Sequence, residues 1–387
     1  IVYCNRGSGG GNAVGNEQST ALGAIREMEA RQAAASFGIT NVWFLQGRDT
    51  PGQDLFQSLA TWHHGAVLED VVRLIRLTRP EVVFTWLPHF VAGENHGDHQ
   101  AAGVIATEAF DIAGDPTVFP AHVMAPRERT DINNATEGLH PWQPKKLYFF
   151  SDASHDIVAE GPAFDQTAIS HTRREPYYKI AASLHAPHRT QGETSAAAVE
   201  ALRTGDFSWF NAWLGRFRLI FGKSLVHCVP TGDVFDGITA EPVAYRRPPG
   251  YLPRPGRGVS LALGGPFEFY RNFWPAHGIE RVGPLVRPEI EVAAGSYLHI
   301  PLLIRNDTPD SASVTLRPLL PSGWREANGS GTYRIPPGGA AAVQTFVRCA
   351  EGTTTNPVDV SWEASSAGAR LGDVTLHVTL KDWTLPQ

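Results

Sequence analysis

Two histidines and a carboxylate stand together in the segment Glu94-Asn95-His96-Gly97-Asp98-His99. The segment follows an apolar run, Val82–Trp86, and opens a stretch with helical spacing that reaches Ile112. Open α/β sheets bind ligands at the carboxyl ends of their strands, so this is a suitable place for an active site. In a helix that begins near the aspartate, both imidazoles can converge on one point while the carboxylate fixes the tautomer of one ring.

These residues predict a hydrolytic zinc site with His99 as a ligand and His96 as an acid or electrophile. The alternative is that Asp98 caps a helix between two ordinary surface histidines, and the spacing alone does not decide. A catalytic zinc has three protein ligands and a water. None of the remaining candidates stands beside a carboxylate in a recognisable pattern; they are His63, His64, His89, His140, His155, His185 and His188.

The glycine-rich stretch Gly7–Gly15 raises the alternative that the chain binds a nucleotide. A dinucleotide fingerprint needs glycines at i, i+2 and i+5, but Asn12 and Val14 occupy the third position of the two possible frames. Gly222-Lys223-Ser224 matches the end of a phosphate loop, but Phe217 stands where that loop needs its first glycine. The stretch therefore predicts a backbone that closely approaches a neighbour or a sugar-like substrate.

Two further polar groups stand on or beside expected helices. Arg26 and Glu29 lie on the first expected helix, where the alternative is a solvated charge pair. His188-Arg189-Thr190-Gln191 follows a helical stretch, where the alternative is a polar helix end.

Short apolar runs alternate with helical stretches over the first 150 residues, which predicts a parallel α/β sheet. Residues 170–222 then have a mainly helical pattern. The expected strands are Ile1–Cys4, Val42–Leu45, Val82–Trp86 and Lys146–Phe150, and the expected helices are Glu17–Phe37, Val67–Thr78 and Asp98–Ile112.

Seven short runs, many of them alternating, lie between residues 290 and 380 and predict a β-sandwich. Helix signals fade between residues 230 and 284, where several prolines break any regular element. We therefore expect a first domain at residues 1–228 with a core at 1–195, a connector at 229–283, and a sandwich at 284–387.

Composition excludes several classes of protein. The 387 residues are 42% hydrophobic and 19% charged, which suits two or three globular domains. A formal net charge of −6 argues against nucleic-acid binding, and three scattered cysteines argue against a disulfide scaffold. No run approaches the ~18 apolar residues of a membrane span. Because Ile1 already begins a strand-like run, we expect the chain to begin within the fold.

Taken together, these segments resemble the PIG-L/LmbE-like family of zinc-dependent N-deacetylases over about residues 1–195. The C-terminal residues loosely resemble the β-sandwich modules of bacterial glycosidases. The segments that carry the first resemblance are Asn5-Arg6-Gly7, Gly10–Gly15, Leu22–Arg26, Arg79–Val83, Pro141–Leu147, His96–His99 and His188–Gly192.

The resemblance implies a Rossmann-like α/β fold, an immunoglobulin-like sandwich, and hydrolysis of an N-acetyl group on an amino sugar or glycan. It implies that His99 binds zinc, that His96 stabilises the tetrahedral intermediate, and that Asp98 orients His96. We assign Arg26 and His188 to substrate binding on the same basis. Similarity to secreted bacterial members implies a secreted or periplasmic location, and the oligomeric state stays open.

One family motif is missing from the sequence. The family's His-Pro-Asp-Asp supplies the other two zinc ligands and the general base, but here His140-Pro141 is followed by Trp142. The resemblance thus implies that a first βα unit of about 25–35 residues is missing. We expect this chain to bind zinc weakly and to lack deacetylase activity. The alternative is a carbohydrate-binding or structural protein with a degenerate deacetylase domain, and the sequence encoded upstream of Ile1 would distinguish the two.

Overall fold

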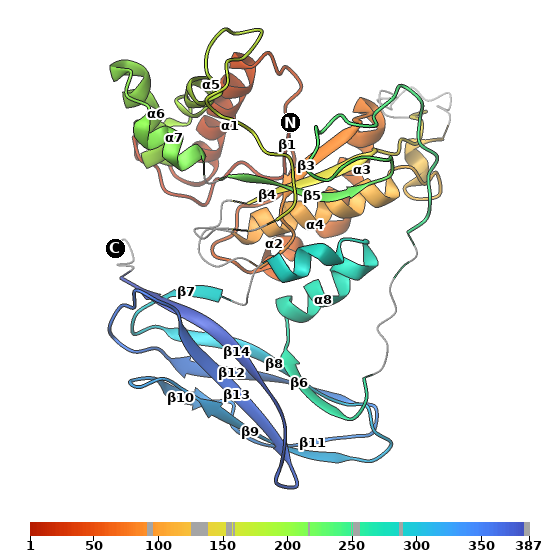
Figure 1. Ribbon diagram of the computed structural model, residues 1–387, viewed down its shortest axis with the longest axis vertical. Helices are drawn as coiled ribbons and strands as arrows, with labels where there is room; N and C mark the ends of the chain where they lie inside the picture. The colour runs from red at the N-terminus through yellow and green to blue at the C-terminus, as the bar shows by residue number, and fades with distance from the viewer. Residues whose placement is uncertain are drawn as a thin grey trace. The chain divides into compact units, whose positions relative to one another are not determined.

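A computed structural model describes residues 1–90, 96–124, 138–151, 157, 159–215, 217–248, 250, 256–285 and 289–382. The chain divides into two compact units, shown in Figure 1. Unit 1 comprises Ile1–Pro88, Asn95–Asp152 and Asp156–Pro248, and unit 2 comprises His89–Glu94, Ala153–His155 and Pro249–Gln387.

Unit 1 begins with a small parallel sheet and one long helix. Strand β1 (Val2–Tyr3) pairs with β2 (Trp43–Phe44), and helix α1 (Ser19–Ser36) connects them. Apart from Glu29, the buried side of α1 is formed by small and aliphatic residues such as Leu22, which lets neighbouring segments approach closely. The helix ends just before Gly38, which adopts a positive φ of 77°.

A second sheet of unit 1 contains β3 (Val82–Trp86), β4 (Lys146–Ser151) and β5 (Arg218–Ser224). The central strand β4 is parallel to β3 and antiparallel to β5, and almost all of its residues are buried. The helices associated with this sheet are α2 (Leu55–Thr61), α3 (His64–Thr78) and α4 (Gly97–Ile112). Helix α4 packs on β3 and β4, and α3 packs on α4.

The predicted parallel sheet is therefore only partly right. The structure has two separate sheets, and β5 runs antiparallel to its neighbour. The segment that becomes β5 was expected to be helical, but pairing with β4 overrides that local pattern. Gly222 sits in an irregularity of this pairing, where a Cβ would lie 2.7 Å from the carbonyl oxygen of Leu147.

Three short helices form a separate cluster within unit 1. They are α5 (Tyr177–His185), α6 (Glu193–Thr204) and α7 (Ser208–Leu214), and they bury Ala182, Ala198 and Phe210 between them. A 3-10 helix, Arg189–Gln191, connects α5 to α6. The predicted substrate residue His188 immediately precedes this connection.

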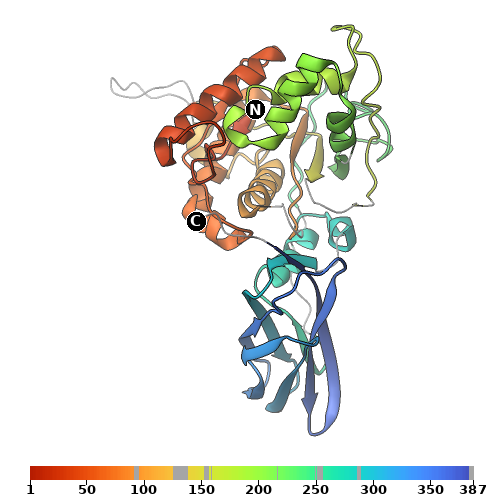
Figure 2. The same ribbon diagram turned by 90° about the vertical axis from the view of Figure 1, so that its left-hand side faces the viewer.

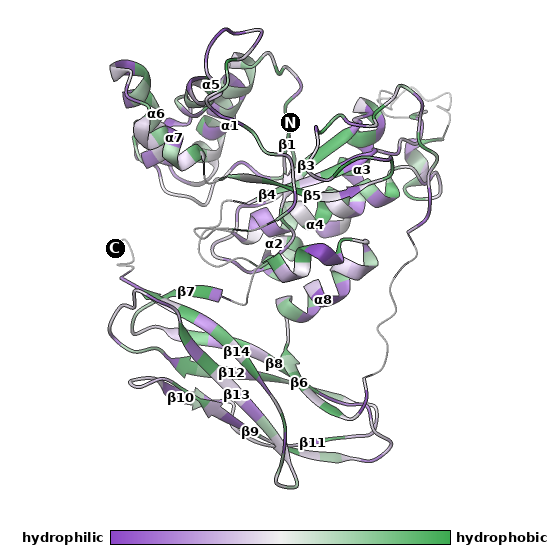
Figure 3. Ribbon diagram, viewed as in Figure 1, coloured by the Kyte–Doolittle hydropathy of each residue, from purple (hydrophilic) through white to green (hydrophobic). Residues whose placement is uncertain are grey.

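Unit 2 contains two sheets that share one apolar core, including the fully buried Trp362. Figure 3 shows hydrophobic and hydrophilic residues alternating along its strands, and Figure 2 shows the unit from a second side. One sheet has the order β10-β12-β8-β6 and the other β11-β9-β13-β14-β7. Their bounds are β6 Val259–Leu263, β7 Glu289–Ala293, β8 Tyr297–Asn306, β9 Ala312–Leu319, β10 Arg325–Asn328, β11 Gly331–Ile335, β12 Ala340–Arg348, β13 Val358–Ser366 and β14 Ala369–Lys381.

All seven strands predicted in this region are present, and β6 and β10 are additional. The stretch predicted as a connector contains β6, helix α8 (Pro266–Ala276) and a 3-10 helix, Glu280–Leu285. The expected fading of helical structure there is wrong, because Pro266 occupies the first turn of α8 and Pro275 lies next to its last residue. The three predicted domain limits stay predictions. No helix among the described residues is long and apolar enough to span a membrane.

Candidate metal and substrate site

The first turn of α4 places the predicted catalytic residues. His96 is the N-cap, and its Nδ1 accepts a hydrogen bond from the backbone N–H of Asp98 at 3.3 Å. The neighbouring Gly97 donates its N–H to the carbonyl oxygen of Gly52 at 2.9 Å. The alternative in which Asp98 caps the helix is wrong, because the aspartate lies inside it.

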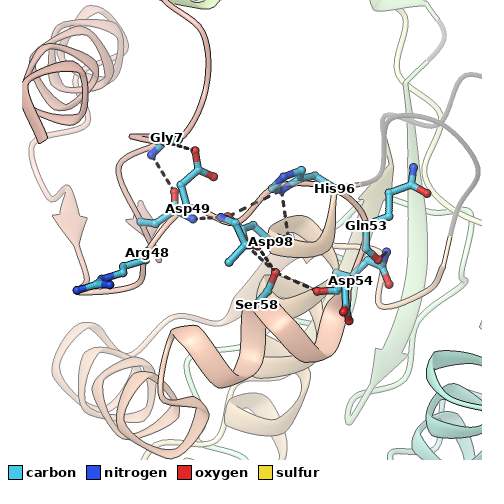
Figure 4. Close-up of polar contacts among 12 residues, drawn as sticks. Gly7, Arg48, Asp49, Gln53, Asp54, Ser58, His96 and Asp98 are labelled. Carbon is cyan, nitrogen blue, oxygen red and sulfur yellow. Dashed lines mark hydrogen bonds and ion pairs between the residues drawn. The ribbon is translucent and has the colours of Figure 1, made fainter. Parts of the chain in front are cut away.

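Asp98 is buried and held by hydrogen bonds from three parts of the chain, drawn in Figure 4. Its Oδ2 accepts from Asn5 Nδ2 at 2.7 Å and from the N–H of Thr50 at 3.2 Å. Its Oδ1 accepts from Thr50 Oγ1 at 2.6 Å and from Ser58 Oγ at 2.7 Å. A carboxylate has about four acceptor positions, so these bonds occupy them and fix the group.

Asp49 lies beside Asp98, although no motif in the sequence includes it. Its Oδ2 accepts the N–H of Gly9 at 2.8 Å. Burial raises the pKa of the Asp49 carboxyl, its hydrogen bond with Asp98 raises it further, and the Gly9 N–H opposes the shift. The loop that carries Asp49 has no periodicity, so the sequence offered no signal for its position.

Asp49, His96 and Asp98 each offer a ligand atom, and these atoms lie within 4.8 Å of one another. Two carboxyl groups in contact favour a cation or a shared proton between them, and an imidazole with oxygen donors suits zinc. The donor set therefore fits a divalent metal. Because the oxygens of Asp98 already accept four hydrogen bonds and His96 Nδ1 accepts the Asp98 N–H, Asp49 is the member with most room for a ligand bond.

His99 is not in that three-residue group, although its ring lies close by. The ring centroids of His96 and His99 are 6.0 Å apart, so the two imidazoles approach one another as the spacing predicts. The His99 ring also stacks on Trp86, with centroids 3.7 Å apart and planes 6° from parallel.

The other candidate histidines do not join the metal group in the described part of the chain. His64 pairs with Glu108 at 2.5 Å, and His89 lies in unit 2, where its Nε2 is 3.1 Å from the Gly283 carbonyl oxygen. His185 lies in the helical cluster with His188, and His155 is outside the described residues.

Arg26 connects the glycine-rich stretch to the helical cluster. Its guanidinium donates to the carbonyl oxygens of Gly7 and Gly11, the second at 2.8 Å, and to Thr190 Oγ1 at 3.4 Å. A Cβ on Gly7 or Gly10 would lie 2.8 or 2.7 Å from Arg26 Nη1. The predicted close approach of the backbone to a neighbour is confirmed, and that neighbour is Arg26.

The adjacent Glu29 reinforces this connection from a buried position. Its carboxylate accepts from the N–H of Thr190 at 3.0 Å and from Thr190 Oγ1 at 2.7 Å. The N–H of Ala13 donates to the carbonyl oxygen of Thr190 at 3.1 Å. The alternative of a solvated charge pair on α1 is therefore wrong.

A surface pocket of about 460 Å³ opens between these segments. Its lining includes Arg26 but not the metal group or His188; it consists of Gly11, Asn12, Ala13, Arg26, Thr190, Gln191 and Gly192. The segment from Asn5 to Ala13 links the metal group to the pocket. Asn5 and Gly9 donate hydrogen bonds to Asp98 and Asp49, and Gly11 to Ala13 line the pocket. His188 contacts one of the lining residues, with its Nδ1 3.1 Å from Gln191 Nε2.

Burial shifts the pKa of two neighbouring histidines, His185 and His188. Burial lowers the pKa of His185 to about 4, with a smaller contribution from His188. Burial also lowers the pKa of His188, while Glu29 opposes and Arg26 adds to the shift. The His185 ring meets the Trp213 ring edge-on, with centroids 5.0 Å apart. Both imidazoles are therefore favoured in their neutral form.

We expect His185 to make unit 1 less stable in mild acid. The folded pKa of about 4 lies below the usual 6.5, so the unfolded chain binds the proton more readily as pH falls. The stabilisation is complete above about pH 6.5 and is lost as pH falls from there to about 4, by about 2–3 kcal/mol. Exchange of α5 amides between pH 4 and 7 measures this, and His185→Gln should flatten the dependence. An equal pH dependence of α5 exchange in the original chain and in His185→Gln would contradict this prediction.

Comparison with known proteins finds a family-model match in the first part of the chain. Residues 1–110 match the PIG-L family model, described as GlcNAc-PI de-N-acetylase. The PIG-L match covers Arg26, Asp49 and the whole His96–His99 segment. It indicates a deacetylase-type hydrolase for unit 1 and ends before β4. No curated protein matches the chain.

Similar solved structures each share only part of the chain. E. coli alpha-2-macroglobulin is 16% identical over 23% of this chain and 6% of its own, with a TM-score of 0.21. A family 123 glycoside hydrolase from Clostridium perfringens is 11% identical over 33% of this chain and 28% of its own, at 0.23. The PapD-like domain 7 of human CEP192 is 10% identical over 38% of this chain and 99% of its own, at 0.21. The first two are covered over well under two thirds of their length.

Proposed function

We propose that unit 1 is a metal-dependent amide hydrolase that removes the N-acetyl group of an amino sugar or glycoconjugate. The observation that most supports this is the convergence of Asp49, His96 and Asp98 within the residues that match PIG-L. On the same resemblance we propose a Rossmann-like fold for unit 1, an immunoglobulin-like fold for unit 2, and a location outside the cytoplasm.

The proposed chemistry divides among the residues of the site. A bound zinc ion supplies a Lewis acid and lowers the pKa of its water towards about 7. His99, from the family resemblance, and Asp49, from its place in the metal group, are the residues that would hold it. Asp98 acts as a positioning residue, because its oxygens are already taken by neutral donors. Water adds to the acyl carbon, the C–N bond breaks, and acetate and a protonated amine leave.

His96 is the residue that meets the developing oxyanion. Because the Asp98 N–H donates to His96 Nδ1, the neutral ring carries its proton on Nε2. A donor of this kind is worth on the order of 3 kcal/mol in comparable sites. The Asp98 carboxylate lies 3.8 Å from the same Nδ1. The backbone N–H of Asp98, at 3.3 Å, is therefore the closer contact of this ring nitrogen.

The pocket beside Arg26 suits the sugar. Its lining offers the amides of Asn12 and Gln191 and main-chain groups of a glycine-rich loop. Neutral donors and acceptors of this kind match hydroxyl groups, and close backbone approach needs residues without side chains.

Replacing His99 with glutamine is expected to lower both zinc affinity and acetate release. His96→Gln should lower acetate release while zinc affinity stays within about twofold, because the ring acts on the oxyanion. Calorimetric zinc titration and acetate release from N-acetylglucosamine glycosides measure the two effects, in this chain and in any longer form that its gene encodes. His64→Gln is the control, since His64 pairs with Glu108. A His99→Gln variant that keeps both properties would contradict the assignment.

The alternative function is carbohydrate binding by a degenerate deacetylase domain. It is favoured by the pocket beside Arg26, whose neutral amide and main-chain groups suit a sugar without any metal. Saturable binding of N-acetylglucosamine glycosides by every form of the protein, with no metal-dependent acetate release, would support this alternative over hydrolysis.

A further inference from the structure

Trp86 occupies a defined position at the carboxyl end of β3. Its ring stacks on the His99 ring with centroids 3.7 Å apart and planes 6° from parallel. Its ring also meets Phe150 of β4 at 4.5 Å with planes 54° apart. Trp86 and Phe150 are directly paired in the sheet, so the strand register fixes this contact. The indole is thus supported by the sheet and presents a flat face to the histidine.

A close approach between α4 and β3 brings the histidine over this face. A Cβ on Gly103 would lie 2.4 Å from the carbonyl oxygen of Trp86, so only glycine permits the approach here. Thr85 Oγ1 donates to the carbonyl oxygen of Ala102 at 3.2 Å and ties the same turn to the strand. His99 lies four residues before Gly103, so both lie on the same side of the helix.

We propose that Trp86 is a positioning residue that fixes the plane of the His99 imidazole for metal binding. This inference rests on the proposed function, in which His99 is a metal ligand. A stacked indole restricts rotation of the ring by covering its face, whereas a metal binds at the edge of an imidazole. Aromatic pairs in such arrangements are worth about 0.5–1.5 kcal/mol beyond their buried area. The stack therefore reduces the entropy that His99 loses when it binds a metal.

Removing the stack should weaken metal binding without removing a ligand. Substitution of groups that orient metal ligands typically lowers affinity by about 10–100-fold. We expect Trp86→Leu to raise the zinc Kd by about tenfold. Trp86→Phe keeps an aromatic face and should restore affinity to within about threefold of the original chain.

The test compares zinc titrations of the original chain, Trp86→Leu, Trp86→Phe and His99→Gln. Trp209→Phe is the matched control, because Trp209 is half exposed on α7 and belongs to the helical cluster. Quenching of tryptophan emission by Cu²⁺ gives a second readout, since a metal on His99 lies against Trp86. The quenched fraction should fall in Trp86→Phe and stay unchanged in Trp209→Phe.

The outcomes separate the positioning role of Trp86 from the assignment of His99 as a metal ligand. If His99→Gln binds zinc weakly and Trp86→Leu binds like the original chain, the positioning role is wrong and the metal assignment stands. If His99→Gln binds like the original chain, or if the original chain shows no saturable binding, both are wrong. Should Trp86→Leu not fold, Trp86→Phe and the loss of Cu²⁺ quenching decide: an unchanged quenched fraction would overturn the proposal.

Discussion

Replacing Asp98 with asparagine is expected to lower the local stability of α4 by about 3 kcal/mol and to weaken metal binding further. The carboxylate accepts four hydrogen bonds, from Asn5, Thr50 and Ser58. An asparagine has only one oxygen acceptor, so its NH₂ group must face donors on one side. Buried donors left without partners cost about 1–3 kcal/mol each, which makes this substitution severe although it changes few atoms.

Hydrogen exchange at the amides of α4 measures this effect directly. A whole-chain unfolding signal would mix the two units, whereas exchange reports each segment separately. The matched control is Asp206→Asn, because Asp206 is exposed and makes a simple turn bond to the N–H of Ser208 at 3.0 Å. If Asp98→Asn shifts the exchange free energy of α4 by less than about 0.5 kcal/mol, the four bonds do not fix the site.

The candidate site shows which part of such a centre can be read from a sequence. His96, Asp98 and His99 were predictable because they are neighbours on one helix, whose spacing fixes their directions. Asp49 was not predictable, since it comes from an irregular loop that tertiary contacts bring beside α4. The four hydrogen bonds to Asp98 likewise come from three residues far from it in sequence, Asn5, Thr50 and Ser58. The sequence therefore suggested a carboxylate near His96 but not the groups that hold it.

In the fold, too, elements with strong local patterns were predictable and elements that depend on tertiary contacts were not. The strands β3 and β4 and the helices α1, α3 and α4 carry strong local patterns, and the structure has them within a few residues. The strand β5 was missed because its identity depends on pairing with β4 rather than on its own alternation. In unit 2 most strands were predictable from alternation, since each has one face in a shared core and one in solvent.

The glycine-rich stretch was predictable in part. The number of glycines predicted a close approach, and the failed fingerprints excluded a nucleotide, but neither gave the partner. Arg26 lies about two turns inside the following helix, and its side chain contacts the carbonyl oxygens of Gly7 and Gly11. These contacts of Arg26 join the loop that binds Asp49 to the residues that line the pocket.

Substituting lysine for Arg26 should therefore loosen the stretch from Gly7 to Ala13. A guanidinium can donate to two carbonyl oxygens and a hydroxyl at once, and a single ammonium on a flexible stem cannot. We expect exchange at the amides of Gly9 and Ala13 to become about tenfold faster, and affinity for N-acetylglucosamine glycosides to fall by a similar factor. Arg31→Lys on the same helix is the control, because Arg31 pairs with Glu27 at 2.8 Å and donates to the carbonyl oxygen of Val42. Equal exchange in both variants would mean that backbone contacts alone hold the loop, and that the pocket forms without the arginine.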